Sequence, residues 1–235
     1  MEFRQKKSYL SCSVMMKKMT STFAKNIIKN YKSIIDRLYK DGLILRHNEL
    51  SYKNENNECK LEYYTKNEHS NVLYDSSIRS IDLYDSLFKH NQFNIEFKDG
   101  SLLLFQCLIS KDVITKQRII FIKPFLNDYN DDDMYDDSWE SYQNADNASN
   151  LLNFPLIIRA DYNSDEFKSD HPVSHLTLSN IASCRIPVVA NISFGRFVEF
   201  ILHQIFNRYD IDLVKPNYAR SIRDYEEKMV HISWK

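Results

Sequence analysis

The chain has 235 residues, enough for a sizeable core, and its 43% hydrophobic and 27% charged residues are usual for a globular protein. A formal net charge of -1 excludes a chain-wide positive field that would attract nucleic acid or an acidic membrane. The three glycines, Gly42, Gly100 and Gly195, lie far apart, which excludes the glycine-rich phosphate loops of P-loop, Rossmann and kinase folds.

The four cysteines are also widely spaced and form no CxxC pair. We therefore expect neither a disulfide framework nor a cysteine metal site, and we expect a reducing compartment. We also expect no cofactor. No apolar run approaches the roughly 20 residues that cross a bilayer, and the N-terminus lacks the cleavage pattern of a secretory signal. The sequence predicts a cytoplasmic protein that does not bind a membrane.

The first 40 residues are basic, with ten Lys and Arg side chains against two carboxylates. Residues 1–20 show no periodicity, and we expect them to form a flexible basic arm. In 23–39 apolar side chains recur at helical spacing, which predicts a helix. Ser21 or Thr22 can cap its start, and Gly42 supplies the left-handed residue that ends it.

The lysines of this helix lie off its apolar stripe. They can contact a phosphate backbone or an acidic partner, or they can form an ordinary solvated face. We favour the solvated face because the net charge of the chain is close to zero.

After Gly42 the sequence pattern changes to short β-prone runs separated by polar turns. The predicted strands are 43–46, 60–64, 93–98, 101–108, 118–123, 155–161, 175–179 and 185–190. Asp99-Gly100 between two of these runs is the strongest hairpin signal in the chain. Strands and helices do not alternate regularly, which favours an antiparallel sheet.

Two more helices are predicted, a weaker one over 76–90 and a long one near 193–209. The sequence therefore predicts an α+β fold, in which an antiparallel sheet is packed by the N-terminal helix and the long helix. We expect 21–235 to form a single domain of this class.

The segment 127–150 carries a dense acidic cluster without Lys or Arg. A divalent-metal site is one interpretation, but an EF-hand loop needs a glycine in its middle, and this segment has none. We favour a solvated acidic loop, which is typical of such runs of charge.

A group of polar residues follows this loop. Because side chains alternate along a strand, Arg159 and Asp161 share one face of the predicted strand 155–161. His175 lies on the next strand, Arg185 opens the one after it, and His171 lies in the turn between the first two strands. If these strands are neighbours, we expect Arg159, Asp161, His175 and Arg185 to gather on one polar surface. A turn at Pro172 can bring His171 and His175 together there. Pro187 marks the last strand as an edge or a bulge.

Such a group has three interpretations. Two imidazoles can act as acid and base while arginines neutralise a phosphate, as in a metal-independent ribonuclease or phosphotransferase, which makes His171, His175, Arg159, Asp161 and Arg185 candidate catalytic residues. The same arginines can instead bind an anion or RNA without chemistry. The third interpretation is structural, with an Arg–Asp salt bridge and a histidine that caps a turn.

Five motifs resemble those of a family of uncharacterised bacterial proteins, a domain of unknown function, over residues 25–210. They are Phe93…Lys98-Asp-Gly-Ser101, Ile158-Arg-Ala-Asp161, His171-Pro-Val-Ser-His175, Cys184-Arg-Ile-Pro187 and Phe197…Phe200-Ile-Leu202. The resemblance implies genes in mobile or phage-defence neighbourhoods. The motifs are also loosely similar to small toxins of toxin–antitoxin pairs. The acidic loop and the basic arm are not part of the pattern and are candidates for partner contact.

The function that follows is a component of a bacterial anti-phage defence or toxin–antitoxin system that acts on RNA or a nucleotide through its His and Arg surface. The alternative is a non-enzymatic adaptor that holds a partner protein or a nucleotide signal. A protein from the same system is the expected partner in either case.

Overall fold

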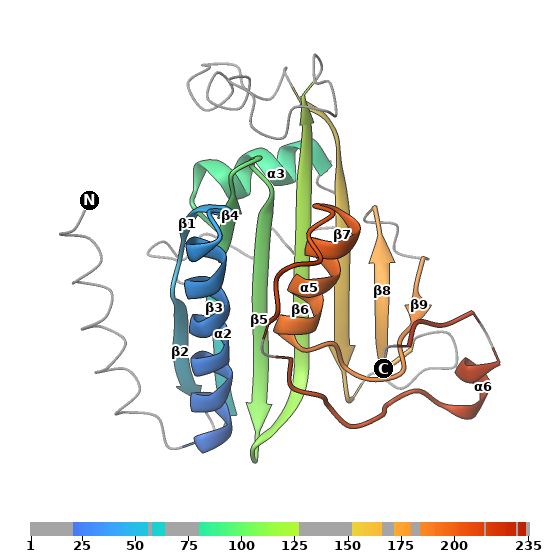
Figure 1. Cartoon of the computed structure of the whole chain (residues 1–235). Helices are drawn as coiled ribbons and strands as arrows, with labels where there is room; N and C mark the ends of the chain where they lie inside the picture. Colours follow the sequence, from blue (N-terminus) through green and yellow to red (C-terminus); the bar gives the residue numbers. More distant parts are fainter. Residues whose placement is uncertain are drawn as a thin grey trace.

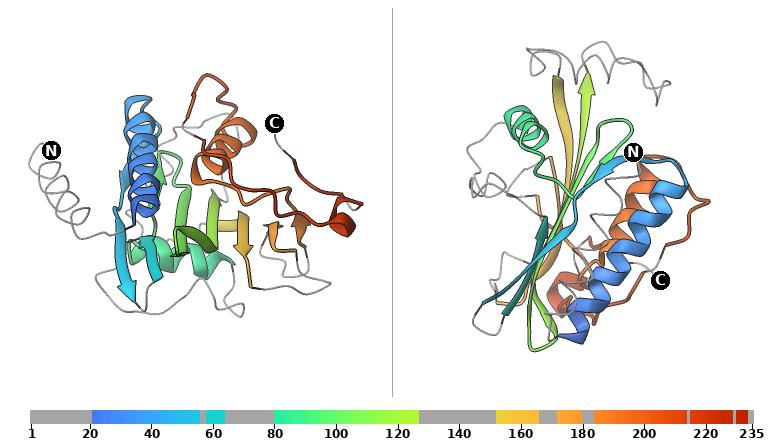
Figure 2. Two further views of the ribbon diagram at one scale, coloured as in Figure 1. Left: turned by 90° about the horizontal axis from the view of Figure 1, so that it is seen from below. Right: turned by 90° about the vertical axis from the view of Figure 1, so that its left-hand side faces the viewer.

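The computed structural model describes residues 21–55, 58–63, 80–126, 152–165, 172–179, 184–213, 215–228 and 230–233. The predicted arm 1–20 and the acidic loop 127–150 lie outside the described residues, as does His171. The described part is an open antiparallel β-sheet with helices on both faces, which confirms the α+β class (Figures 1 and 2).

Nine strands make up the sheet within the described residues. They are β1 (Ile44–His47), β2 (Leu50–Glu55), β3 (Glu58–Tyr63), β4 (Ile95–Phe97), β5 (Leu102–Ser110), β6 (Val113–Leu126), β7 (Leu152–Asn163), β8 (Ser174–Leu178) and β9 (Ile186–Pro187). Their order is β1-β4-β5-β6-β7-β8-β9, and β3 joins β2 to β5. The last strand is a two-residue edge that ends at Pro187, as the proline predicted.

The helices are α2 (Thr22–Lys40), α3 (Ser80–Lys89), α5 (Phe194–Gln204) and the short α6 (Asp224–Glu227). Figure 2 shows α2 and α5 together on one face of the sheet and α3 on the other. None of the described helices is long and apolar enough to span a membrane.

The ends of α2 follow the sequence signals. The Ser21 hydroxyl accepts a hydrogen bond from the Ala24 N–H at 3.0 Å, which caps the first turn. At the other end Gly42 has φ 67°, and the Leu43 N–H donates to the Leu38 carbonyl. This closes the helix as a glycine does best, because a left-handed residue with a Cβ is strained.

The predicted helix near 193–209 ends earlier, at Gln204. Asn207 has φ 51°, and the Arg208 N–H donates to the Leu202 carbonyl. Asparagine tolerates this left-handed conformation better than most residues and can end a helix without glycine.

Two tight turns connect β4, β5 and β6. Asp99-Gly100 joins β4 to β5, as predicted, with Gly100 at φ 78°. The turn between β5 and β6 is Lys111-Asp112, where both residues have positive φ. The second turn lacks glycine, so the sequence signal for it was weak.

Alternation along β6 and β7 creates two different sheet faces. Ile119 and Phe121 of β6 and Ile158 and Ala160 of β7 pack into the core beneath α2 and α5. On the opposite face, a smaller apolar cluster beneath α3 covers one end of the same strands. Beyond α3 this second face becomes polar, and the predicted site residues lie there.

Candidate functional site

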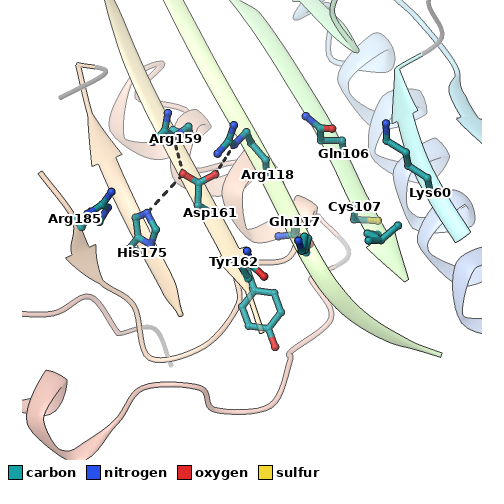
Figure 3. Close-up of a pocket in the computed structure, with 13 residues that line it drawn as sticks. Lys60, Gln106, Cys107, Gln117, Arg118, Arg159, Asp161, Tyr162, His175 and Arg185 are labelled. Atoms are coloured by element: carbon teal, nitrogen blue, oxygen red, sulfur yellow. Dashed lines mark hydrogen bonds and ion pairs between the residues drawn. The ribbon is translucent and has the colours of Figure 1, made fainter. Parts of the chain in front are cut away.

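Three neighbouring strands bring the charged residues together. In the antiparallel register Arg118 of β6 lies opposite Asp161 of β7, and Asp161 lies opposite His175 of β8. Arg159 is two residues from Asp161 on the same strand and therefore shares its face. Figure 3 shows these four side chains converging, with Arg185 beside His175. The predicted gathering of Arg159, Asp161, His175 and Arg185 on one surface is found.

Asp161 is the centre of this cluster. The Arg118 Nε–H donates to Asp161 Oδ1 at 2.6 Å, and Arg159 Nε lies 2.6 Å from Oδ2. The side chains are partly buried: Arg118 is 23%, Arg159 19% and Asp161 12% exposed. In such a setting charge–charge interactions are stronger than at an open surface, because water screens them less. One carboxylate thus holds two guanidinium groups in fixed positions.

Both ring nitrogens of His175 face protein groups. Its Nδ1 lies 2.9 Å from the Pro172 carbonyl, which can only accept, so Nδ1 carries the proton. Its Nε2 faces Asp161 Oδ2 at 3.7 Å, and the side chain is 3% exposed. The hydrogen bond to the Pro172 carbonyl therefore sets the orientation of the ring, with Nε2 on the side of Asp161.

Arg185, just before β9, completes the described part of the predicted set. Among the described residues, neither the Nε of Arg185 nor the buried hydroxyl of Thr177 has a hydrogen-bond partner. Both groups lie near the edge of the sheet, where β8 pairs with the short β9. His171 belongs to the predicted set but lies outside the described residues.

The cluster opens into a pocket of about 550 Å³. The pocket is lined by the four predicted residues that the structure describes, Arg159, Asp161, His175 and Arg185. Arg118 also lines it, and the lining continues across the sheet to Lys116 and Lys60. Among the described residues that line it, the charged groups are five cations and the single carboxylate of Asp161. This pocket is strongly positive although the whole chain has a net charge of -1.

The structure adds Arg118, Lys116 and Lys60 to the residues predicted from sequence. Arg118 was included in a predicted strand but not in the site. The sequence signal that could have added Arg118 to the site is the alternation of side chains along β6. One face carries Lys116, Arg118 and Ile120, and the other carries Gln117, Ile119 and Phe121. That alternation identifies the face, but only the pairing of β6 with β7 identifies Asp161 as its partner.

Hydrogen bonds on the opposite face of β6 connect the strand that carries Arg118 to the segment before α5. Gln117, next to Arg118 on β6, points to the opposite face, and its Nε2 donates to Asn191 Oδ1 at 2.8 Å and to the Ile192 carbonyl at 2.5 Å. These buried bonds join β6 to the residues that precede α5. They hold the backbone that carries Arg118 in place.

The described residues offer neither a reactive thiol nor a metal centre at this site. Burial raises the pKa of Cys107, which borders the pocket, far above its ordinary value. A thiol of that kind stays protonated and is a poor nucleophile. Within the described ranges no three His, Cys, Asp or Glu side chains gather as metal ligands.

Comparison with known proteins assigns the chain to a family. Residues 43–234 match the model of the family described as "Uncharacterized conserved protein (DUF2290)". The chain belongs to this family. No curated protein and no solved structure matches it at a significant level. The matched residues include every strand from β1 to β9 and therefore the whole described site.

Proposed function

We propose that the protein binds a phosphate-bearing ligand, RNA or a nucleotide, in the pocket around Asp161. The observation that carries this proposal is the charge of the pocket: five cationic side chains and one carboxylate among the described lining residues. An arginine held by a carboxylate is already oriented and loses little conformational entropy when an anion arrives.

The geometry favours two guanidinium groups as the clamp. Arg118 and Arg159 each contact a different oxygen of Asp161 through Nε. A guanidinium has five N–H donors, so each arginine can contact Asp161 and a second anion at once. Arg118 and Arg159 are thus positioned to bind oxygens of one phosphate group.

Binding without chemistry is the interpretation that the histidine favours. A general base needs a ring nitrogen within hydrogen-bond reach of the substrate. Both nitrogens of His175 face protein groups, the Pro172 carbonyl and the Asp161 carboxylate. We therefore propose that His175 fixes the turn before β8 through the Pro172 carbonyl, and the catalytic role stays a prediction that the experiments below address.

We further propose that this binding serves a bacterial anti-phage defence or toxin–antitoxin system, with a partner protein from the same system. The support is the resemblance of the motifs to proteins in such gene neighbourhoods. Cells that express the full system should resist phage, and the double substitution Arg118→Gln/Arg159→Gln should remove that resistance while the protein still accumulates. Full resistance with this variant would count against a role for the pocket in defence.

The binding proposal is tested with two probes, uridine monophosphate and a 12-nucleotide oligouridylate, measured by calorimetry. We expect at least one probe to bind, and Arg118→Gln or Arg159→Gln to weaken it about tenfold or more, because each removes a charge-assisted hydrogen bond. The matched control is Arg37→Gln, which also removes a salt-bridged arginine, but from α2 on the opposite face. Equal losses in the control, or no binding by the wild type, would refute the proposal.

The catalytic interpretation makes a different prediction for the same probes. If the site is an enzyme, the oligouridylate or the nucleotide is consumed, and His175→Ala stops consumption while binding persists. If the site only binds, chromatography recovers the probe intact after long incubation with wild-type protein. Consumption that depends on His175 would replace our proposal with the catalytic one.

A further inference from the structure

The cationic pocket continues well beyond the arginine cluster. Lys116 lies two residues before Arg118 on β6 and on the same face. Lys60 of β3 lies opposite Leu108 of β5, and Leu108 lies opposite Lys116. The two lysines therefore flank one leucine on the floor of the same pocket. We call the set Arg185, Arg159, Arg118, Lys116 and Lys60 the cationic track.

The cationic track runs diagonally across the sheet, as Figure 3 shows from Arg185 at one side to Lys60 at the other. It passes from β9 to β3 by way of β8, β7, β6 and β5. Five strand spacings correspond to about 24 Å. This length is several times the width of one phosphate group, so a single nucleotide covers only part of it.

The charges along the track are unevenly balanced. At one end Lys60 is paired with Glu62 of its own strand at 2.7 Å, and Glu62 also lies 3.6 Å from Lys53. Lys116 is exposed and has no ion pair within the described part of the chain. In the middle, Asp161 faces two arginines. Positive charge is thus in excess along the described track, and the excess suits a ligand with several phosphates.

The track does not provide a platform for bases. The only aromatic residue among the described pocket lining is Tyr162, and it packs against the core on the α2 and α5 side. Proteins that hold single strands by their bases stack them on exposed rings. Here the polar groups of the lining can contact the backbone, which carries no sequence information.

We propose that the ligand is a single strand of RNA that lies along the cationic track and is bound through its phosphates, with little dependence on base sequence. This inference rests on the proposed function, because it places one phosphate of the strand at Arg118 and Arg159. It adds that further phosphates lie at Lys116 and Lys60 on one side and at Arg185 on the other.

The experiment compares fluorescence anisotropy of a labelled 12-nucleotide oligouridylate with calorimetry of uridine monophosphate. The wild type should bind the strand more than tenfold tighter than the mononucleotide. The logarithm of the affinity should fall with the logarithm of salt concentration with a slope of about -3, as expected for four or five phosphate contacts on a single strand. An oligoadenylate of equal length should bind within about threefold.

The decisive variant is the double substitution Lys60→Gln/Lys116→Gln, at two partly or fully exposed side chains. It should weaken strand binding about tenfold and make the salt slope shallower by about 1. Uridine monophosphate, whose single phosphate is placed at Arg118 and Arg159, should lose less than about threefold. The matched control Lys29→Gln/Lys40→Gln changes the charge equally, at exposed lysines of α2 on the opposite face. Thermal unfolding of each variant verifies that it is folded.

The outcomes separate this inference from the proposed function. If Lys60→Gln/Lys116→Gln binds the strand like the wild type while Arg118→Gln weakens both probes, the site holds a single phosphate and the track is wrong. If the control variant causes the loss, the strand binds to α2 and the track is also wrong. If Arg118→Gln affects neither probe, the proposed function fails.

Discussion

The α3 side of the sheet carries two arginine–carboxylate groups that differ in charge balance and surroundings. One is the pair of Arg46 on β1 and Glu96 on β4, which lies beside α3 and has one charge of each sign. The other is the cluster of Arg118 and Arg159 around Asp161, which lies beyond α3 and lines the pocket. The comparison shows how one sheet face combines a structural ion pair with a candidate binding site.

In the first group two aromatic rings lie beside Arg46, whose side chain is 48% exposed, while its partner Glu96 is fully buried. The Arg46 guanidinium lies 5.4 Å from the centre of the Phe88 ring and 5.1 Å from that of Phe93. Glu96 is fully buried and accepts a hydrogen bond from Arg46. Burial raises the pKa of Glu96 above its usual value, and the neighbouring Arg46 opposes that rise. The charges of the pair cancel, which is typical of a pair that stabilises a fold.

The second group borders the pocket instead. Two guanidiniums share one carboxylate, a third lies nearby, and the same face opens into the pocket. A folded protein gains little from partly buried like charges unless something neutralises them. The contrast separates an ion pair that we expect to stabilise the fold from a cluster that, under the proposed function, binds a ligand. Three substitutions test this contrast by their effect on stability.

The largest loss of stability is expected for Arg46→Ala. It leaves the buried Glu96 carboxylate without its cation, which costs about 3 kcal/mol in the free energy of unfolding at neutral pH. Urea denaturation measures this loss, and Arg46→Lys should recover part of it. A loss below about 1 kcal/mol would show that the pair does not stabilise the fold.

The loss in Arg46→Ala should depend on pH. In the wild type burial raises the pKa of Glu96 in the folded state. The ionised carboxylate therefore lowers the free energy of unfolding once the pH rises above the pKa of Glu96 in the unfolded chain, and this cost is absent below that pKa. Without Arg46 the folded pKa rises further, and the extra cost grows with it. The difference between variant and wild type should therefore shrink as the pH falls towards 4.

A smaller loss, about 2 kcal/mol, is expected for Asp161→Asn. The substitution removes the charge that holds Arg118 and Arg159, but both guanidiniums are partly exposed and can be hydrated again. Added salt should reduce the loss, because it screens the repulsion between the remaining cations. Denaturation at low and high salt measures this effect. A loss as large as that of Arg46→Ala, and independent of salt, would make the two groups equivalent.

The smallest effect on stability is expected for Arg118→Gln, within about 1 kcal/mol, because Arg159 still neutralises Asp161. Its main effect should concern the ligand. The 12-nucleotide oligouridylate should raise the unfolding temperature of the wild type more than that of the variant, since stabilisation by a ligand grows with its affinity for the folded state. Equal stabilisation of both proteins would show that Arg118 does not contact the ligand.

Much of the fold followed from local signals. The cap at Ser21, the left-handed Gly42 and the Asp99-Gly100 turn predicted the ends of α2 and the β4–β5 hairpin, because each signal acts over a few residues. The polar strand β2 was not predicted, since its residues are not typical of strands. It forms because β3 pairs along its whole length.

The candidate site was predicted in part. Alternation along the strand placed Arg159 and Asp161 on one face, and the short separation of the next strands brought His175 and Arg185 close. Alternation along β8 places Leu178 on the same face as the buried Leu176, yet Leu178 is exposed at the end of the strand.

What the sequence determined by itself is which side chains share a face, because the period of a strand is a property of the backbone alone. Only the tertiary structure decided that β6 lies beside β7, that Arg118 therefore meets Asp161, and that β3 extends the same surface to Lys60. Strand order depends on the packing of many distant residues at once. It is also what gathers positive charge in one pocket of a chain whose charges otherwise almost cancel.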